Sequence, residues 1–74
     1  MAADVRVRFA KRLKELRQEK SYSVPELARR SGVSRWHICD LELPVPQKRV
    51  TIVTLEKLAR GLAVPLWELL KFSG

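Results

Sequence analysis

The apolar residues of this chain recur at helical spacing almost from end to end, and no stretch alternates as a strand would. The first apolar stripe has spacings of four, four and three positions and consists of Val5, Phe9, Leu13 and Leu16. Asp4 precedes this stripe and has the side chain of a good N-cap. The pattern therefore predicts a first helix that starts after Asp4 and buries the stripe.

The other faces of this first helix are basic, and they carry Arg6, Arg8, Lys11, Arg12, Lys14 and Arg17. A row of charges on a helix is usually a solvated face. The same row also fits a position near phosphates. Both interpretations stay open from the pattern alone.

Residues 20–22 interrupt the pattern, and a second helix follows with a clear start and end. Ser23 and Glu26 form a capping box, in which the Ser side chain caps the helix and the Glu side chain bonds back. Pro25 falls in the first turn, where a missing N–H costs little. Gly32 can adopt the left-handed conformation that ends a helix.

A third helix is predicted over residues 35–41, with Ser34 as its cap. Residues 43–49 then form the main loop, which two prolines stiffen and which has a basic tip. A fourth helix begins after Thr51, and its predicted inner face consists of Ile52, Leu55, Leu58, Ala59 and Leu62.

Gly61 and Ala63 weaken the end of that fourth helix, and Pro65 opens a fifth over residues 66–72. Five helices with short connections predict a compact all-α fold. At 74 residues we expect one domain, residues 1–74, with a core too small to wall a deep catalytic cavity.

Residues 24–43 carry the most informative pattern. Two helices that cross steeply through a three-residue turn need a small side chain at the crossing, Ala28, and a residue tolerant of positive φ, Gly32. The expected core of this unit consists of Leu27, Ala28, Gly32, Val33, Ile38 and Leu41. The outward face of the third helix is left free and carries Arg35, Trp36, His37, Cys39 and Asp40.

Charge narrows the range of partners. Fifteen Lys and Arg against eight Asp and Glu give a net charge of +7 and a pI near 10.4. Such a field attracts polyanions, of which nucleic acid is the commonest, although membrane surfaces and acidic proteins would feel it too. Hydrolytic triads, clustered metal ligands and phosphate-binding glycine loops are missing from the sequence, so we expect no enzyme, no metal and no cofactor.

The single cysteine, Cys39, cannot form an intrachain disulfide, which fits a reducing compartment. A redox switch at Cys39 has no partner thiol in the chain, so a small residue tolerated near the outward face is the simpler interpretation. No apolar run approaches the roughly 20 residues of a membrane span, and the N-terminus lacks the apolar stretch of a signal peptide. We expect a cytoplasmic protein of a prokaryote or phage, associated with the nucleoid when bound.

Five segments in order resemble the lambda-repressor-like helix-turn-helix family, also called the xenobiotic-response-element family. The matching segments are Lys14 to Arg17, Ser23 to Ala28, Ser31 to Ser34, Ile38 to Glu42, and Leu55 to Leu70. The resemblance spans residues 9 to 70 and implies a five-helix DNA-binding domain. Its third helix enters the major groove of duplex DNA, and two-fold dimers bind half-sites about one helical turn apart.

The resemblance also implies residue roles. Arg35, Trp36 and Asp40 match positions that touch base edges, whereas Ser23 and Ser34 match positions that meet phosphates. Further backbone contacts are expected from His37, Lys48 and Arg49. Arg17 and Glu42 match a salt bridge between the first and third helices.

Three departures from the family pattern stand out. Val24 occupies a position where the family often has a Gln that reaches the DNA backbone. Ser21 and Leu43-Pro44 stand where glycine is usual, and the following loop is a residue or two longer than the common form. The placement of Gln47, Lys48 and Arg49 against DNA is therefore the least secure of these expectations.

Each outward residue also has a plainer interpretation. Arg35 either pairs with guanine or touches phosphate or water. Trp36 either packs on a thymine methyl or the DNA backbone, or folds against the second helix or the loop. Asp40 accepts a hydrogen bond from cytosine, orients a basic neighbour, or repels phosphates in nonspecific complexes. His37 either contacts phosphate or is an ordinary surface residue.

The C-terminal helix has more large apolar residues than one short helix usually buries. Core packing is one interpretation, and the resemblance implies a dimer contact by Pro65, Trp67, Leu70 and Phe72. We expect a transcriptional regulator that binds double-stranded DNA as a homodimer on a palindromic operator, without a membrane or small-molecule partner. The alternative is an adaptor or antitoxin-type module with a regulatory protein partner. Phage repressors, restriction-modification controllers and antitoxins all fit the pattern.

Overall fold

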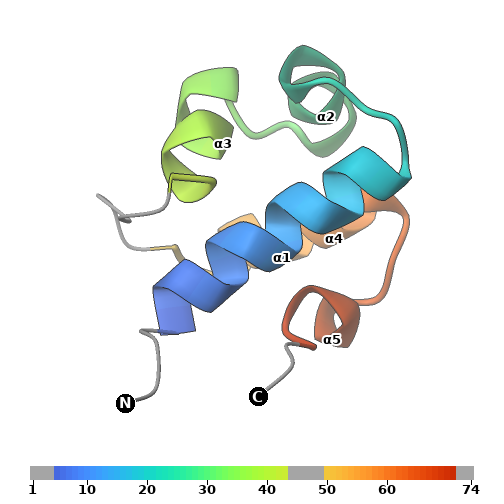
Figure 1. Cartoon of the computed structure of the whole chain (residues 1–74). Helices are drawn as coiled ribbons and strands as arrows, with labels where there is room; N and C mark the ends of the chain where they lie inside the picture. Colours follow the sequence, from blue (N-terminus) through green and yellow to red (C-terminus); the bar gives the residue numbers. More distant parts are fainter. Residues whose placement is uncertain (1–4, 44–49, 72–74) are drawn as a thin grey trace.

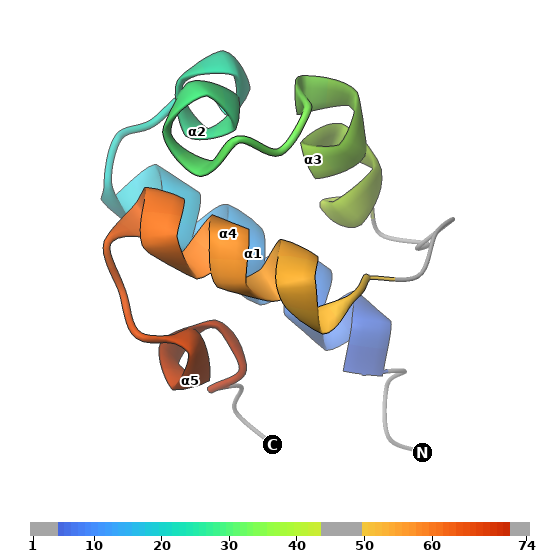
Figure 2. The same cartoon turned by 180° about the vertical axis from the view of Figure 1, so that it is seen from behind.

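The computed structural model describes residues 5–43 and 50–71, and the regular secondary structure in these ranges is helical. The helices are α1 (Val5–Glu19), α2 (Val24–Ser31), α3 (Arg35–Leu41), α4 (Ile52–Leu62) and α5 (Leu66–Leu69). The predicted all-α, five-helix fold is confirmed. In Figures 1 and 2, α2 and α3 stand at one end of the molecule and α5 at the other, with α1 and α4 between them. None of the described helices is long and apolar enough to cross a membrane.

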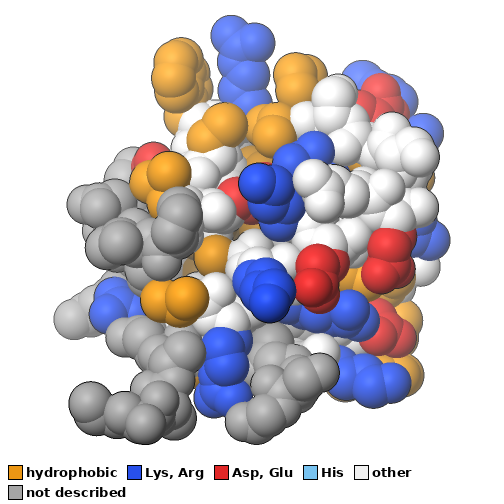
Figure 3. All heavy atoms as spheres, viewed as in Figure 1, with side chains coloured by type: hydrophobic (Ala, Val, Ile, Leu, Met, Phe, Trp, Pro, Cys, Tyr) orange, Lys and Arg blue, Asp and Glu red, His pale blue; other side chains and the backbone are white. Residues whose placement is uncertain are grey.

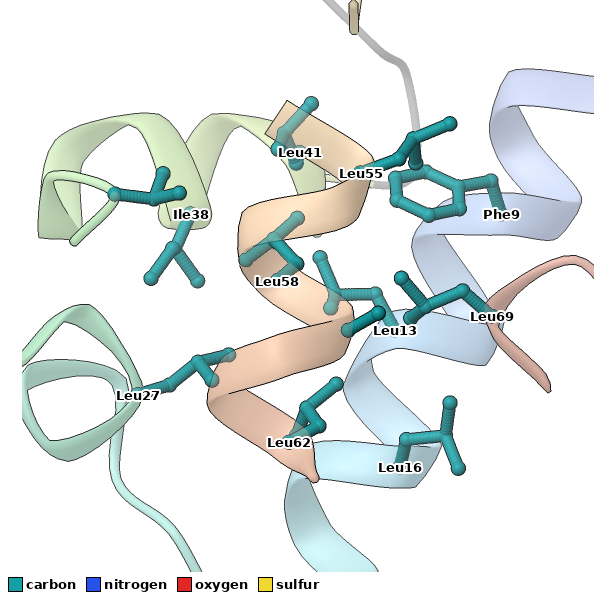
Figure 4. Packing of buried hydrophobic residues seen from close by; sticks show 12 residues of the cluster. Phe9, Leu13, Leu16, Leu27, Ile38, Leu41, Leu55, Leu58, Leu62 and Leu69 are labelled. Carbon is teal, nitrogen blue, oxygen red and sulfur yellow. The ribbon is translucent and has the colours of Figure 1, made fainter. Parts of the chain in front are cut away.

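A single apolar core receives side chains from all five helices, as Figure 4 shows. Leu13 of α1 and Leu58 of α4 meet at its centre, and neither is exposed to solvent. Leu69 anchors α5 in the same core and is also fully buried. Removal of any one of these leucines would leave a cavity that costs about 2–5 kcal/mol, so the end with α2 and α3 rests on a rigid base.

Side-chain caps start three of the helices, as the sequence predicts. The hydroxyls of Ser23, Ser34 and Thr51 each accept from the backbone N–H three residues later, at 3.1, 3.2 and 3.2 Å. The second bond of the predicted capping box, from the Glu26 side chain back to Ser23, is replaced by other contacts. The carboxylate of Glu26 pairs with Arg29 and Arg30 on the next turn and not with Ser23, because two guanidinium groups compete for it.

The core ends earlier than the apolar stripes predict. Val5 and Ile52 were expected on inner faces but are 56% and 71% exposed. Each is the first residue of its helix, one turn before Phe9 or Leu55, where burial begins. A stripe shows which face is apolar but does not show how far the neighbouring helices extend along it.

The start and end of α5 can also be compared with the prediction. Pro65 caps α5, but this helix ends at Leu69 and is shorter than the predicted 66–72. The N–H groups of Leu70 and Lys71 bond to carbonyls three residues back, at 3.1 and 3.4 Å, a tightening typical of a helix end. Asp4, proposed as a cap, lies outside the described residues, as does Phe72.

Gly61 has a different role from the one predicted. It was expected to weaken the end of α4, but it is buried inside the helix where α2 crosses α4. A Cβ atom at this position would lie 2.6 Å from Cβ and 2.8 Å from Cα of Ser31. The crossing is therefore close because residue 61 has no side chain, and it sets the distance of α2 from the core.

Candidate nucleic-acid interface

The turn between α2 and α3 is short and well defined. Gly32 has φ of 80°, and its N–H bonds to the carbonyl of Ala28 at 2.9 Å. The N–H of Val33 bonds to the hydroxyl of Ser31 at 3.1 Å, and the Val33 side chain is buried. Ala28 packs against the edge of the core. These contacts fix the direction in which the chain enters α3.

The inner face of α3 is clamped to the core. Ile38 is fully buried and Leu41 is 4% exposed, and Figure 4 shows both directed toward the leucines of α4. Leu27 of α2 is fully buried beside them. Because these apolar side chains hold α3 from behind, its opposite face is free for a partner.

The outward face of α3 presents one large aromatic and several polar side chains. Trp36 is 75% exposed, so the interpretation in which it folds against α2 is wrong. Arg35 is also exposed, and its guanidinium carbon lies 5.8 Å from the centre of the Trp36 ring. His37 and Asp40 are half-buried, whereas the thiol of Cys39 is exposed and free.

Basic and apolar side chains project from the end of the molecule formed by α2 and α3, as seen in Figure 3. Arg30 of α2 stacks over the ring of Tyr22 at 4.5 Å. Its neighbour Arg29 shares the Glu26 carboxylate, and the hydrogen bond from Arg29 lowers the pKa of Glu26 below its usual value. The half-buried carboxylate of Glu26 is therefore paired with two arginines, which leaves this end of the molecule attractive to anions.

The two serine caps lie at the N-termini of α2 and α3. The Ser23 and Ser34 hydroxyls are exposed and accept from the backbone, so each can still donate its own proton to an anion. Val24, which stands where the family often has Gln, packs partly against the core and supplies no polar group. The contacts to an anion at this end therefore fall to the caps and to the neighbouring basic residues.

Arg17 and Glu42 form the ion pair that the resemblance implies. Nε and Nη2 of Arg17 donate to the two carboxylate oxygens at 2.8 and 2.9 Å, and Nη1 donates to the carbonyl of Tyr22 at 2.8 Å. The side chains are only 13% and 9% exposed. Hydrogen bonding to Glu42 raises the pKa of Arg17 above its usual value, against the opposing effect of burial. Since Glu42 caps α3, this pair ties the end of α3 to α1.

Exposed apolar groups lie at α5, opposite α2 and α3, and at the start of α4. Trp67 on α5 is 61% exposed, Leu70 directly after this helix is 44% exposed, and Pro65 directly before it is also exposed. Ile52 and Val53 at the start of α4 are 71% and 57% exposed. The exposure of this second pair follows from its place in the first turn of α4, before burial begins at Leu55.

Some expected site residues cannot be placed. Lys48 and Arg49, predicted to contact the DNA backbone, lie outside the described residues. Within residues 5–43 and 50–71, no three His, Cys, Asp or Glu side chains gather as metal ligands would.

Comparison with known proteins reveals the same architecture elsewhere. A model of the helix-turn-helix family matches residues 13–69. The crystal structure of the restriction-modification controller protein C.AhdI from Aeromonas hydrophila matches with a TM-score of 0.80 and 38% sequence identity. That match covers 86% of this chain and 94% of the controller protein. No curated protein matches the sequence.

Proposed function

The chain belongs to the helix-turn-helix family, and from this premise we propose that it binds duplex DNA as a sequence-specific transcriptional regulator, with α3 as the recognition helix. The observation that carries the proposal is the two-sided character of α3. Ile38 and Leu41 are buried behind it, and Arg35 and Trp36 are exposed in front. The net charge of +7 predicted a polyanionic partner, and the resemblance of five segments to this family implied a DNA-binding regulator and not an enzyme.

The dimensions of α3 suit the major groove. An α-helix with its side chains is about 10–12 Å in diameter, which matches the width of about 12 Å of the major groove of B-DNA. The seven residues of α3 extend for about 10 Å along the helix axis. Arg35 at its first turn pairs with guanine O6 and N7, and Trp36 beside it packs on a thymine methyl or a sugar. Asp40 accepts from a cytosine amino group or orients Arg35.

Backbone contacts provide most of the affinity. We assign them to the caps Ser23 and Ser34, to His37, and to the loop residues Lys48 and Arg49. Such contacts position the protein and carry no sequence information. The net charge of +7 supports this division of roles, because neutralisation of phosphates releases counterions.

We further propose that the protein acts as a homodimer. Trp67 on α5 and Leu70 at its C-terminal cap, with Ile52 and Val53 on α4, provide the exposed apolar surface that a second copy would cover. Pro65 and Phe72 complete the expected contact. The principal extents of the molecule are 36 × 22 × 22 Å, so two copies can place their α3 helices about 34 Å apart, one turn of DNA.

Among the regulators that the sequence leaves open, similarity to C.AhdI favours a controller of restriction-modification genes acting on a palindromic operator. It would act in the bacterial cytoplasm, where its DNA lies. An adaptor or antitoxin-type module would need a different outward face on α3, and no contact favours that alternative over DNA.

Selection of bound sequences from a random DNA pool tests the proposal. We expect a two-fold symmetric site, bound far more tightly than random duplex at the same salt concentration. Arg35→Ala should abolish the preference at one base pair of each half-site, at a loss of about 1–3 kcal/mol. Arg29→Ala, which removes an exposed arginine from α2, is the matched control and should keep that preference. If no duplex is enriched and none binds at low salt, the proposed function is wrong.

A further inference from the structure

Helix α1 makes a second partly buried charged contact, at the end of the molecule opposite to α3. Nη2 of Arg12 donates to Oε2 of Glu68 at 2.6 Å, and Nε donates to the backbone oxygen of the same residue at 3.1 Å. The two side chains are 17% and 25% exposed. Arg12 therefore holds one residue of α5 by both its side chain and its backbone.

Helix α5 depends on such a contact for its orientation. It has four residues, and its cap Pro65 makes no side-chain hydrogen bond, so it has little helical stability of its own. Leu66 and Leu69 attach it to the core along one line. At 100° per residue, Glu68 lies on one side of this line and Trp67 on the other. Because Arg12 fixes Glu68, it also fixes the direction in which Trp67 faces.

Two arginines on α1 thus reach two different elements. Arg17 holds the end of α3 through Glu42, and Arg12 holds α5 through Glu68. Helix α1 therefore connects α3, the proposed recognition helix, to α5, the helix proposed to carry the dimer contact. The angle between α3 and the dimer contact of each protomer determines how the two α3 helices of a dimer are separated and rotated.

We propose that Arg12 is a positioning residue that gives the dimer its selectivity for the spacing between half-sites. This inference rests on the proposed function, because it requires a dimer on two half-sites. One extra base pair between the half-sites shifts the second one by about 3.4 Å and rotates it by about 34°. A dimer with rigidly held α5 helices cannot follow that change, whereas a dimer with loosened α5 helices can.

A series of operators tests this proposal. The selected half-sites are placed at the selected spacing and at one and two base pairs more or fewer, and dissociation constants are measured by fluorescence anisotropy. For the wild-type protein we expect about a tenfold loss of affinity for each one-base-pair change. For Arg12→Gln we expect a loss of about twofold for the same change. Glu68→Gln should fall between them, because it keeps the backbone acceptor.

Lys14→Gln is the matched control, since Lys14 lies exposed on the same helix. Any change in affinity should be by the same factor at every spacing, so its spacing profile should match that of the wild type. Hydrogen exchange in the DNA-free protein gives an independent readout. Arg12→Gln should speed exchange at the Leu70 and Lys71 amides about tenfold and leave the amides of α1 and α4 protected.

The outcomes separate the two proposals. A wild-type spacing profile for Arg12→Gln, or exchange that rises equally in all helices, would overturn the positioning role of Arg12. Binding of the wild-type protein to single half-sites as a monomer would overturn the proposed dimer, and the positioning role would fall with it.

Discussion

At the scale of single residues, two positions hold side chains in the left-handed backbone region that favours glycine. Ser21 has φ of 60° between α1 and α2, and Ala63 has φ of 58° at the end of α4. A side chain in this conformation is strained by about 1–2 kcal/mol because Cβ approaches the following carbonyl. The family resemblance implies glycine at position 21, and the strain at Ser21 explains that preference in physical terms.

Replacement of Ala63 by Gly should stabilise the protein. The N–H of Ala63 already bonds to the last carbonyls of α4, and glycine adopts this conformation without strain. We expect the free energy of unfolding to rise by about 0.5–1 kcal/mol, after the larger chain entropy of glycine in the unfolded state is counted. Urea denaturation measures this change. Lys57→Gly, in the exposed interior of the same helix, should lower stability by about 1 kcal/mol, and a similar loss at position 63 would refute the argument.

The Arg17–Glu42 pair makes a different prediction at this scale. Glu42→Gln removes the charge but keeps the shape, and it leaves a largely buried guanidinium without its anion. We expect a loss of about 2 kcal/mol in the free energy of unfolding, less than for a fully buried pair. Glu56→Gln removes the partner of Arg60 in an exposed pair at 3.4 Å and should change stability by less than about 0.5 kcal/mol. Equal effects of the two substitutions would show that burial of the first pair is unimportant.

At the scale of elements, the crossing of α2 and α4 depends on one missing side chain. Gly61→Ala improves the helix propensity of α4 by up to about 1 kcal/mol but places Cβ within 2.6 Å of Ser31. The clash involves the backbone of Ser31 as well as its side chain, so α2 must shift away from α4. We expect a net loss of about 1–3 kcal/mol by thermal or urea unfolding.

The neighbouring substitution Arg60→Ala serves as the control for that crossing, because Arg60 is exposed. It should leave stability within about 0.5 kcal/mol of the wild type. Unchanged or increased stability of Gly61→Ala would mean that the two helices separate without cost.

The elements themselves could largely be predicted from the sequence, because their signals are local. Three side-chain caps, the left-handed Gly32 and the apolar spacing depend on residues within a few positions of one another. The exposure of Val5 and Ile52 could not be predicted in this way, because it depends on where neighbouring helices end. The crossing at Gly61 and the Arg12–Glu68 contact, which joins residues 56 positions apart, are likewise properties of the tertiary structure.

The candidate site also combines features that the sequence predicts with features that only the tertiary structure decides. The outward face of α3 follows from its inner apolar residues, and Arg17 with Glu42 followed from resemblance to a family. The direction of Trp36 was left open by the pattern and is decided by its 75% exposure. Ile52 was predicted on the inner face but is exposed with Val53, because the core does not reach the first turn of α4.

At the scale of the whole molecule, binding should weaken steeply with salt. Each phosphate neutralised contributes about −0.9 to the slope of log K against log salt concentration, so a dimer with two or more contacts per protomer should show a slope of about −4 or steeper. Lys48→Gln should reduce the magnitude of the slope by about 2 for the dimer, one contact per protomer.

Affinity measurements between about 50 and 200 mM salt give these slopes. Arg60→Gln, which removes a charge on the outer face of α4, should leave the slope unchanged. If the two substitutions alter the slope equally, the effect belongs to total charge and not to a contact made by Lys48.

Cys39, the single cysteine of the chain, is exposed on the outward face of α3. Chemical modification of its thiol can therefore report how much of the protein is bound to DNA. An alkylating reagent reaches the sulfur in free protein, whereas a duplex seated on α3 would shield it. With a saturating pulse of reagent shorter than the lifetime of the complex, the fraction of protein that escapes modification would equal the fraction bound, read by mass spectrometry without a dye or an engineered residue.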